Sequence, residues 1–173
     1  MAKRAGVPLK IAAKIDAIDR AYYEAEIKRL ITPPDVEYVG EINDREKSEF
    51  LGSALGLLFP IDWPEPFGLV MIESLACGTP VIVRPCGSAP EIIRDGVTGF
   101  IAAELEEMVA AVGNLSKLSR QACRQEFETR FTADRMAAEY ERIYQKLVPE
   151  SRSAHDEVTQ RRDTRPTWFN TGS

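Results

Sequence analysis

Two glutamates, Glu65 and Glu73, stand eight residues apart around the start of a predicted helix. The helix, Phe67–Cys77, follows a predicted strand and a proline-rich loop, so its first backbone N–H groups point outward at the carboxyl end of a sheet. Free N–H groups at a helix start bind anions, and Gly68 lets a phosphate approach the backbone closely. Carboxylates accept hydrogen bonds from sugar hydroxyls. This segment predicts a site for a ligand that carries both phosphate and sugar.

The helical spacing sets where the two carboxylates lie. If the helix begins near Pro66, Glu73 lies two turns into it, on roughly the same face as Pro66 and Leu69. The two carboxylates would then bracket the anion site at different depths. In the alternative interpretation, Glu65 is a loop residue favoured by the helix dipole and Glu73 is a solvated helix residue.

Other residues are weaker candidates for the same site. Lys14 and Arg84 follow predicted strands at their carboxyl ends, where they either reach a phosphate or remain surface charges. Gly87 and Ser88 either approach the ligand or cap the next helix. Trp63 either shapes the edge of a pocket or packs.

The whole chain alternates short apolar runs with helical patterns, which is typical of a parallel sheet with crossover helices. From residue 104 onward the pattern is helical only, and beyond Pro149 it is polar and aperiodic. We therefore expect one α/β domain over residues 1–148 and a disordered tail over residues 149–173. The predicted strands are Leu9–Ala13, Val36–Val39, Leu55–Pro60, Val81–Val83 and Phe100–Ala102. The predicted helices are Arg20–Ile31, Arg45–Ala54, Phe67–Cys77, Ala89–Asp95, Glu104–Val112, Ser116–Phe131 and Ala133–Leu147.

Composition excludes several classes of function. The chain has 173 residues and a formal net charge of -5, which disfavours broad electrostatic binding to nucleic acid or anionic lipid. The longest apolar run is broken by Pro60, and the basic start precedes no apolar stretch, so we expect no transmembrane segment and a cytoplasmic location. Three cysteines without a CxxC pair, and a single histidine, His155, argue against disulfides, a metal site and histidine catalysis.

Three segments carry a family resemblance: Glu65–Ile82, with its paired glutamates, then Gly87–Ile93 and Asp95–Phe100. They resemble the donor domain of family 4, or group 1, retaining glycosyltransferases of GT-B architecture, and the resemblance spans roughly residues 1–147. It implies a Rossmann-like, doubly wound parallel sheet. It also implies an enzyme that transfers a glycosyl group from a UDP-, GDP- or ADP-sugar to an acceptor, with neither cofactor nor metal.

The resemblance assigns roles to residues of this sequence. Glu65 matches the glutamate beside the transferred sugar, the one catalytic residue expected here, which would position and stabilise rather than form a covalent bond. Phe67, Gly68 and Leu69 match the stretch whose backbone amides meet the sugar and diphosphate. Glu73 matches the glutamate that holds the ribose hydroxyls.

Two further residues join the expected donor-binding set. Ile42 belongs to the loop Gly40–Ile42, which matches a segment whose backbone commonly contacts the nucleotide base. Lys14 is the basic residue placed to reach a phosphate. A different GT-B enzyme, such as an epimerase, is disfavoured because it would need acid–base groups, and the only histidine, His155, lies in the polar tail.

The resemblance also marks what this sequence does not contain. The family's donor domain opens with a central strand and a loop that supply an Arg and a Lys, and this chain begins after both. The strands at Leu9 and Leu55 would therefore have no strand between them. We expect a truncated domain that is marginal, aggregation-prone or completed by a partner, with the acceptor domain on a separate chain. The alternative is an inactive module of the same fold with weak nucleotide binding.

Overall fold

The computed structural model describes residues 1–148 and divides the chain into two compact units, which begin at Met1 and at Thr132. Each unit is described separately. The predicted tail, residues 149–173, lies outside the described residues.

The N-terminal part of the first unit is a two-stranded parallel sheet of β1 (Leu9–Ala12) and β2 (Val36–Gly40). A short helix, α1 (Ala2–Ala5), precedes it and ends at Gly6, whose φ of 69° is the left-handed cap that the sequence predicts. Between the strands the predicted helix forms with changing pitch. It consists of α2 (Arg20–Tyr22), the π-helical η1 (Tyr23–Ile27) and the 3-10 helix η2 (Lys28–Leu30).

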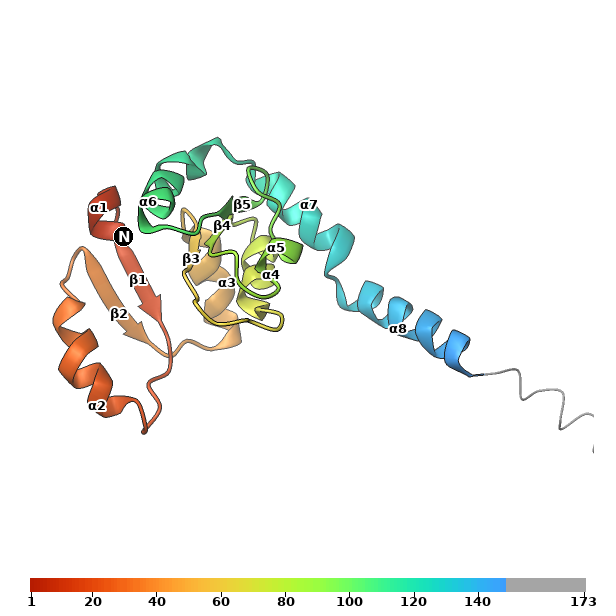
Figure 1. Ribbon diagram of the computed structural model, residues 1–173, viewed down its shortest axis with the longest axis horizontal. Helices are drawn as coiled ribbons and strands as arrows, with labels where there is room; N and C mark the ends of the chain where they lie inside the picture. The colour runs from red at the N-terminus through yellow and green to blue at the C-terminus, as the bar shows by residue number, and fades with distance from the viewer. Residues whose placement is uncertain (149–173) are drawn as a thin grey trace, which may run out of the picture. The chain divides into compact units, whose positions relative to one another are not determined.

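The rest of the first unit is built on a three-stranded parallel sheet in the order β3-β4-β5. Helix α6 lies on one side of this sheet and α4 on the other, and α7 packs against α4 (Figure 1). The strands are β3 (Leu57–Phe59), β4 (Val81–Val83) and β5 (Gly99–Ile101). The helices are α3 (Asp44–Ser53), α4 (Leu69–Ala76), α5 (Ala89–Ile92), α6 (Leu105–Asn114), η3 (Leu115–Lys117) and α7 (Arg120–Arg130).

The parallel α/β architecture predicted from the sequence is confirmed, and all five strands lie where the apolar runs place them. They form two sheets, because no ladder joins β1 to β3 in the described residues. This agrees with the expectation that the strands at Leu9 and Leu55 have no strand between them.

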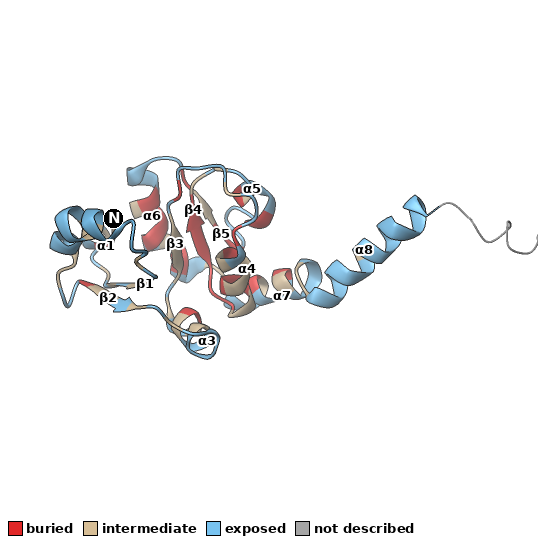
Figure 2. Cartoon of the chain, turned by 90° about the horizontal axis from the view of Figure 1, so that it is seen from below, coloured by how far each residue is buried: buried red, intermediate tan, exposed pale blue. Residues whose placement is uncertain are grey.

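The core is centred on β4, whose residues are completely buried (Figure 2). One face of the sheet packs on α4, α5 and α7 through a cluster that includes Met71, Leu75 and Cys123. The other face packs on α6 through a cluster that includes Ile82 and Met108. A parallel strand that is covered on both faces must be apolar throughout, as Val-Ile-Val is.

A buried carboxylate joins α7 to the loop after α5. Glu126 is 9% exposed and accepts hydrogen bonds from Arg94 at 3.0 Å and Arg130 at 2.7 Å. Burial alone would raise the pKa of Glu126, but these two guanidinium groups hold it below its ordinary value.

The lowered pKa predicts a loss of stability in acid. The pKa of Glu126 is lower in the folded chain than the ordinary value of about 4.5 expected in the unfolded chain. The ionised carboxylate therefore stabilises the fold at pH values above 4.5. This stabilisation is lost as the pH falls from about 4.5 through the folded-state pKa. We expect Glu126→Gln to lower the melting temperature at pH 7 and to flatten its fall below pH 4.5. Melting curves from pH 7 to pH 3 measure this, and parallel curves for the two proteins would contradict it.

The second unit contains α8 (Ala133–Leu147), with the bounds that the sequence predicts. Thr132 caps its start by accepting a hydrogen bond from the backbone N–H of Arg135 at 3.3 Å. Its exposed apolar side chains recur with helical spacing, at Met136, Tyr140, Ile143, Tyr144 and Leu147. Within residues 1–148, none of the helices combines the length and apolarity needed to span a membrane.

Candidate functional site

The start of α4 exposes unsatisfied backbone donors, as the sequence predicts. Gly68 precedes the helix with a left-handed φ of 73° and caps it without a side chain. The N–H groups of Leu69 and Val70, the first two helical residues, have no acceptor within residues 1–148. Both point out of a helix start flanked by the exposed side chains of Phe67 and Leu69. This is the arrangement that binds an anion.

Helix α4 begins at Leu69, two residues later than the sequence predicts. This later start changes the set of backbone N–H groups that are free. The left-handed backbone of Gly68 cannot belong to a right-handed helix, so Phe67 and Gly68 stay in the loop. The N–H of Gly68 donates to the Glu65 carboxylate at 3.0 Å. Of the donors predicted at Phe67, Gly68 and Leu69, only Gly68 N–H is already bonded within residues 1–148, and Val70 adds a further free N–H. The binding roles of these residues stay a prediction.

Glu65 is held on both of its carboxylate oxygens. One accepts from Gly68 N–H, and the other accepts from the indole N–H of Trp63 at 3.1 Å. The sequence left two interpretations open for Trp63, and the structure makes it a hydrogen-bond donor that orients the glutamate. Glu65 is thus fixed just before the start of α4, with lone pairs remaining on each oxygen for hydroxyl donors.

The loop that carries Glu65 rests on Gly87 and Ser88. The backbone N–H of Ser88 donates to the Glu65 carbonyl at 2.9 Å, and the Ser88 hydroxyl donates to the Phe67 carbonyl at 2.8 Å. Gly87 has a φ of 56°, and the backbone of Glu65 occupies the space that a side chain would need. Ser88 therefore supports the Glu65 loop, in addition to standing before α5.

Glu73 lies on α4 and pairs with a lysine of α3. The Lys47 ammonium lies 2.9 Å from the Glu73 carboxylate and 3.2 Å from Asp44. The hydrogen bond to Glu73, and then that to Asp44, raises the pKa of Lys47 above its ordinary value. Lys47 was absent from the sequence-based candidates. The only sequence feature that could have pointed to Lys47 is its helical spacing, three residues after Asp44. The structure shows that this face of α3 turns toward α4.

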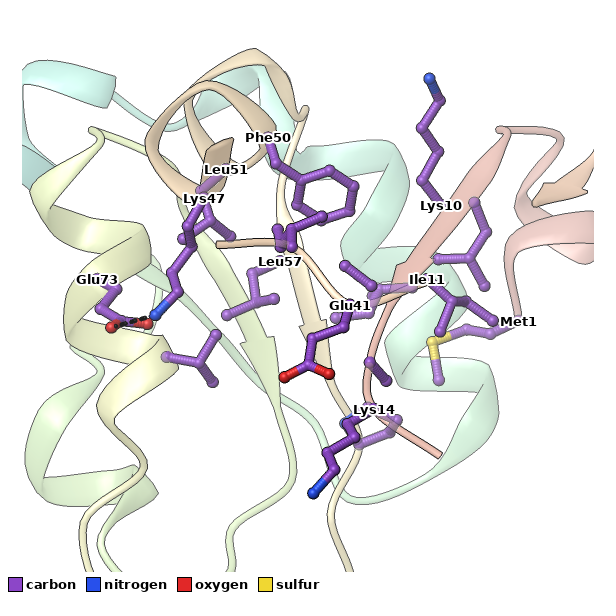
Figure 3. Close-up of a pocket in the computed structure, with 17 residues that line it drawn as sticks. Met1, Lys10, Ile11, Lys14, Glu41, Lys47, Phe50, Leu51, Leu57 and Glu73 are labelled. Atoms are coloured by element: carbon purple, nitrogen blue, oxygen red, sulfur yellow. Dashed lines mark hydrogen bonds and ion pairs between the residues drawn. The ribbon is translucent and has the colours of Figure 1, made fainter. Parts of the chain in front are cut away.

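A groove of about 670 Å³ lies between β1 and β3 and contains the Glu73–Lys47 pair (Figure 3). Lys14, which follows β1, and the loop residues Glu41 and Ile42, which follow β2, also line it. Lys14 is exposed and forms an ion pair with Asp16 at 2.7 Å. Figure 3 places Glu41 and Lys14 at the same end of the groove.

The predicted site residues line two hollows that share no lining residue. Lys14, Ile42 and Glu73 line the groove, whereas Glu65 and Phe67 line a smaller hollow of about 440 Å³ that also includes Gly87 and Ser88. Gly68 and Leu69, at the start of α4, line neither of them.

Arg84 is a further candidate that the sequence offers for a phosphate contact. Arg84 follows β4, and its buried Nε has no hydrogen-bond partner within residues 1–148. Among the same residues, no group of three or more His, Cys, Asp or Glu side chains could hold a metal ion.

Comparisons with known proteins agree on one family. The model of the family described as "Glycosyl transferases group 1" matches residues 9–130. An uncharacterized 41.2 kDa protein from the cps region of Klebsiella pneumoniae is 31% identical over 120 residues, which are 66% of this chain and 33% of that protein. D-inositol 3-phosphate glycosyltransferase of Rhodococcus erythropolis is 38% identical over 89 residues, 45% of this chain and 20% of that enzyme.

Solved structures show the same fold. Sucrose-phosphate synthase from Thermosynechococcus elongatus matches with a TM-score of 0.71 at 23% identity, over 83% of this chain and 40% of the enzyme. Anabaena HepE, solved in complex with UDP, matches with a TM-score of 0.68 at 20% identity, over 82% of this chain and 43% of that protein. The chain therefore spans a third or less of the length of these curated relatives and less than half of these solved chains.

Proposed function

Because the chain belongs to the group 1 glycosyl transferases, we propose that residues 1–131 are the nucleotide-sugar-binding part of a glycosyltransferase. One observation carries the proposal. The free N–H groups of Leu69 and Val70 stand in the sequence between two carboxylates, Glu65 and Glu73, each of which lines a hollow and is held by a hydrogen-bond donor. A diphosphate needs the first feature, and the sugar and ribose that flank it need the second.

Each residue then has a role in holding the donor. Glu73 accepts from the ribose hydroxyls, with Lys47 keeping its carboxylate in place. The backbone at Ile42 lies along the base, and Lys14 at the end of the same groove approaches a phosphate. Glu65 accepts from the hydroxyls of the transferred sugar.

The proposed transfer retains the configuration of the anomeric carbon, and the acceptor is bound by a domain on a separate chain. Glu65 acts by position, because Trp63 and Gly68 fix both of its oxygens before any ligand arrives. We expect neither a metal nor another cofactor to take part. The competing proposal, a module that binds nucleotide weakly and transfers nothing, differs in having no activity when an acceptor domain is supplied.

Glu73→Gln is the variant that tests the donor site. We expect it to weaken UDP binding by about 10- to 100-fold, because hydrogen bonds to a charged acceptor contribute about 1.5–3 kcal/mol. Calorimetry with UDP, GDP and ADP measures the effect and identifies the base. Glu49→Gln is the control, since it makes the same charge change at an exposed position of α3 that lines neither hollow, and it should leave the affinity within about twofold.

The outcomes are distinct. Equal UDP affinity of the wild type and Glu73→Gln would overturn the assignment of Glu73. Glu65→Gln should leave UDP binding close to that of the wild type but reduce the discrimination between UDP-sugars and UDP, because only the sugar reaches that carboxylate.

A further inference from the structure

We propose that the smaller hollow binds one uncharged sugar ring of the acceptor. This hollow extends from the Glu65 loop to the end of α7, and the proposed function gives a role only to Glu65 among its residues. The inference rests on that function, because an acceptor must lie beside the sugar that it receives. It places part of the acceptor site on this chain and adds Glu91, Arg130 and Phe131 to the residues that contact substrate.

The smaller hollow has the composition of a sugar-binding site. Its volume of about 440 Å³ lies within the usual range for small-ligand sites. The rings of Phe67 and Phe131 supply flat apolar surfaces, which suit the C–H face of a pyranose. Three charged side chains also line it: Glu65, Glu91 and Arg130. They supply the hydrogen-bond acceptors and donors that sugar hydroxyls require.

Arg130, at the end of α7, is held in place by three contacts. Its Nη1 donates to the Glu126 carboxylate at 2.7 Å, and its Nη2 donates to the Glu91 carbonyl at 2.7 Å. Its guanidinium carbon lies 4.7 Å from the centre of the Phe131 ring. A guanidinium has more N–H groups than these two bonds use, and the others have no acceptor within residues 1–148. Arg130 therefore brings pre-oriented donors to the hollow, which reduces the ordering that a ligand must impose.

Glu91, in α5, carries a carboxylate that no other described group uses. The side chain is exposed, and within residues 1–148 it accepts no hydrogen bond and forms no ion pair. Only the backbone of Glu91 is bonded, through its N–H to Ser88 and its carbonyl to Arg130. A ligand in the hollow can therefore donate to this carboxylate without displacing a partner.

The charges around the hollow select an uncharged ring. Glu65 and Glu91 are both negative, and the positive charge of Arg130 is paired with Glu126. A phosphorylated sugar or a uronic acid would bring a further anion beside two carboxylates. A neutral ring avoids this repulsion, because its hydroxyls donate to the carboxylates and accept from the guanidinium.

The position of the hollow favours the acceptor over the donor. The transferred sugar is bonded to the diphosphate, and the proposed function puts the diphosphate at the free N–H groups of Leu69 and Val70. Neither residue lines the smaller hollow. A transferred sugar held by Glu65 therefore leaves the part lined by Arg130 and Phe131 for a second ring. That ring would lie next to the transferred sugar, where transfer requires the acceptor to be.

NMR titration of the full chain with simple glycosides tests the proposal. The probes are the methyl glycosides of glucose, galactose and mannose. The matched probes are the corresponding methyl uronides, in which a carboxylate replaces the hydroxymethyl group. We expect at least one glycoside to bind with a Kd of about 1–10 mM and to shift the amide signals of Gly87, Glu91 and Phe131, while Ile82 in β4 stays unchanged. Its uronide should bind at least about tenfold more weakly.

A variant of Glu91 identifies the residue responsible. Glu91→Gln keeps the size of an exposed side chain and removes its charge. We expect it to weaken glycoside binding about fivefold to tenfold and to reduce the discrimination against the uronide to less than about threefold. Glu49→Gln makes the same charge change on α3, away from both hollows, and should leave both quantities unchanged.

Repeating the titration with saturating nucleotide sugar separates the acceptor from the donor. We expect the glycoside to bind equally well in its presence, whereas a glycoside that the nucleotide sugar displaces would overturn the acceptor assignment. No binding of any glycoside to the folded chain, or equal binding of glycoside and uronide, would overturn the sugar site itself. If UDP fails to bind while a glycoside still does, the proposed function fails and the sugar site is supported.

Discussion

Gly87→Ala is expected to lower the free energy of unfolding by about 2–4 kcal/mol and to weaken UDP binding by more than about tenfold. The reason is the close approach of two loops. A Cβ at Gly87 would overlap the backbone oxygen of Glu65 and lie 2.5 Å from its backbone nitrogen. Backbone cannot rotate aside as a side chain can, so the Glu65 loop must move away. That movement breaks the Ser88 N–H bond to Glu65 and shifts the Glu65 carboxylate, to which Gly68 N–H donates. Gly68 leads directly into α4, so the shift also displaces the free N–H groups of Leu69 and Val70, which we propose bind the diphosphate of UDP.

Gly96→Ala separates this effect from ordinary backbone strain. Gly96 also has a left-handed φ, 71°, but nothing lies within 4 Å of the Cβ that it would gain. We therefore expect only the conformational cost, about 1–2 kcal/mol, and unchanged UDP binding. Urea unfolding and calorimetry on both variants measure the difference. Equal losses of stability would show that the Glu65 loop does not depend on contact with Gly87.

The strands could be located from the sequence because a strand that is buried on both faces must consist almost entirely of apolar residues. Val81–Val83 is the clearest case: an uninterrupted apolar run after a proline became the central buried strand. The division into two sheets was also expected, because the resembled family has a further strand between the strands at Leu9 and Leu55. The pitch of residues 20–30 was not foreseeable, since side-chain spacing distinguishes poorly between α, 3-10 and π turns over so few residues.

The sequence indicated which residues belong to the candidate site better than it indicated how they are arranged. The segment was singled out from its residues, and the resemblance gave Glu65 and Glu73 their expected roles. The start of α4, however, depends on a left-handed φ at Gly68, a conformation that a glycine allows and does not require. The partners of the glutamates, Trp63 and Lys47, come from contacts that spacing does not encode. The partner of Glu73, in particular, lies on a different helix, 26 residues earlier.

Arg120→Met should be strongly destabilising, lowering the free energy of unfolding by about 2–4 kcal/mol. The Arg120 guanidinium, at the start of α7, donates to the carbonyls of Ala54 at 2.8 Å and Gly52 at 2.7 Å, and to the Thr79 hydroxyl at 2.7 Å. The two carbonyls belong to the end of α3, where the helix cannot satisfy them itself. Thr79 is fully buried, and its own hydroxyl donates to the Leu51 carbonyl at 2.8 Å.

Arg120→Lys should recover little of this stability, because a single ammonium cannot reproduce a planar fork that serves three acceptors at once. Lys117→Met is the control: it removes an exposed cation from η3, three residues earlier, and should change stability by less than about 0.5 kcal/mol. The midpoints of urea unfolding rank the stabilities of the three variants directly. Since α3 also carries Lys47, loosening its end should reduce UDP affinity in Arg120→Met even where the protein remains folded. If Arg120→Lys were as stable as the wild type, charge alone, rather than the fork geometry, would hold α3 to α7.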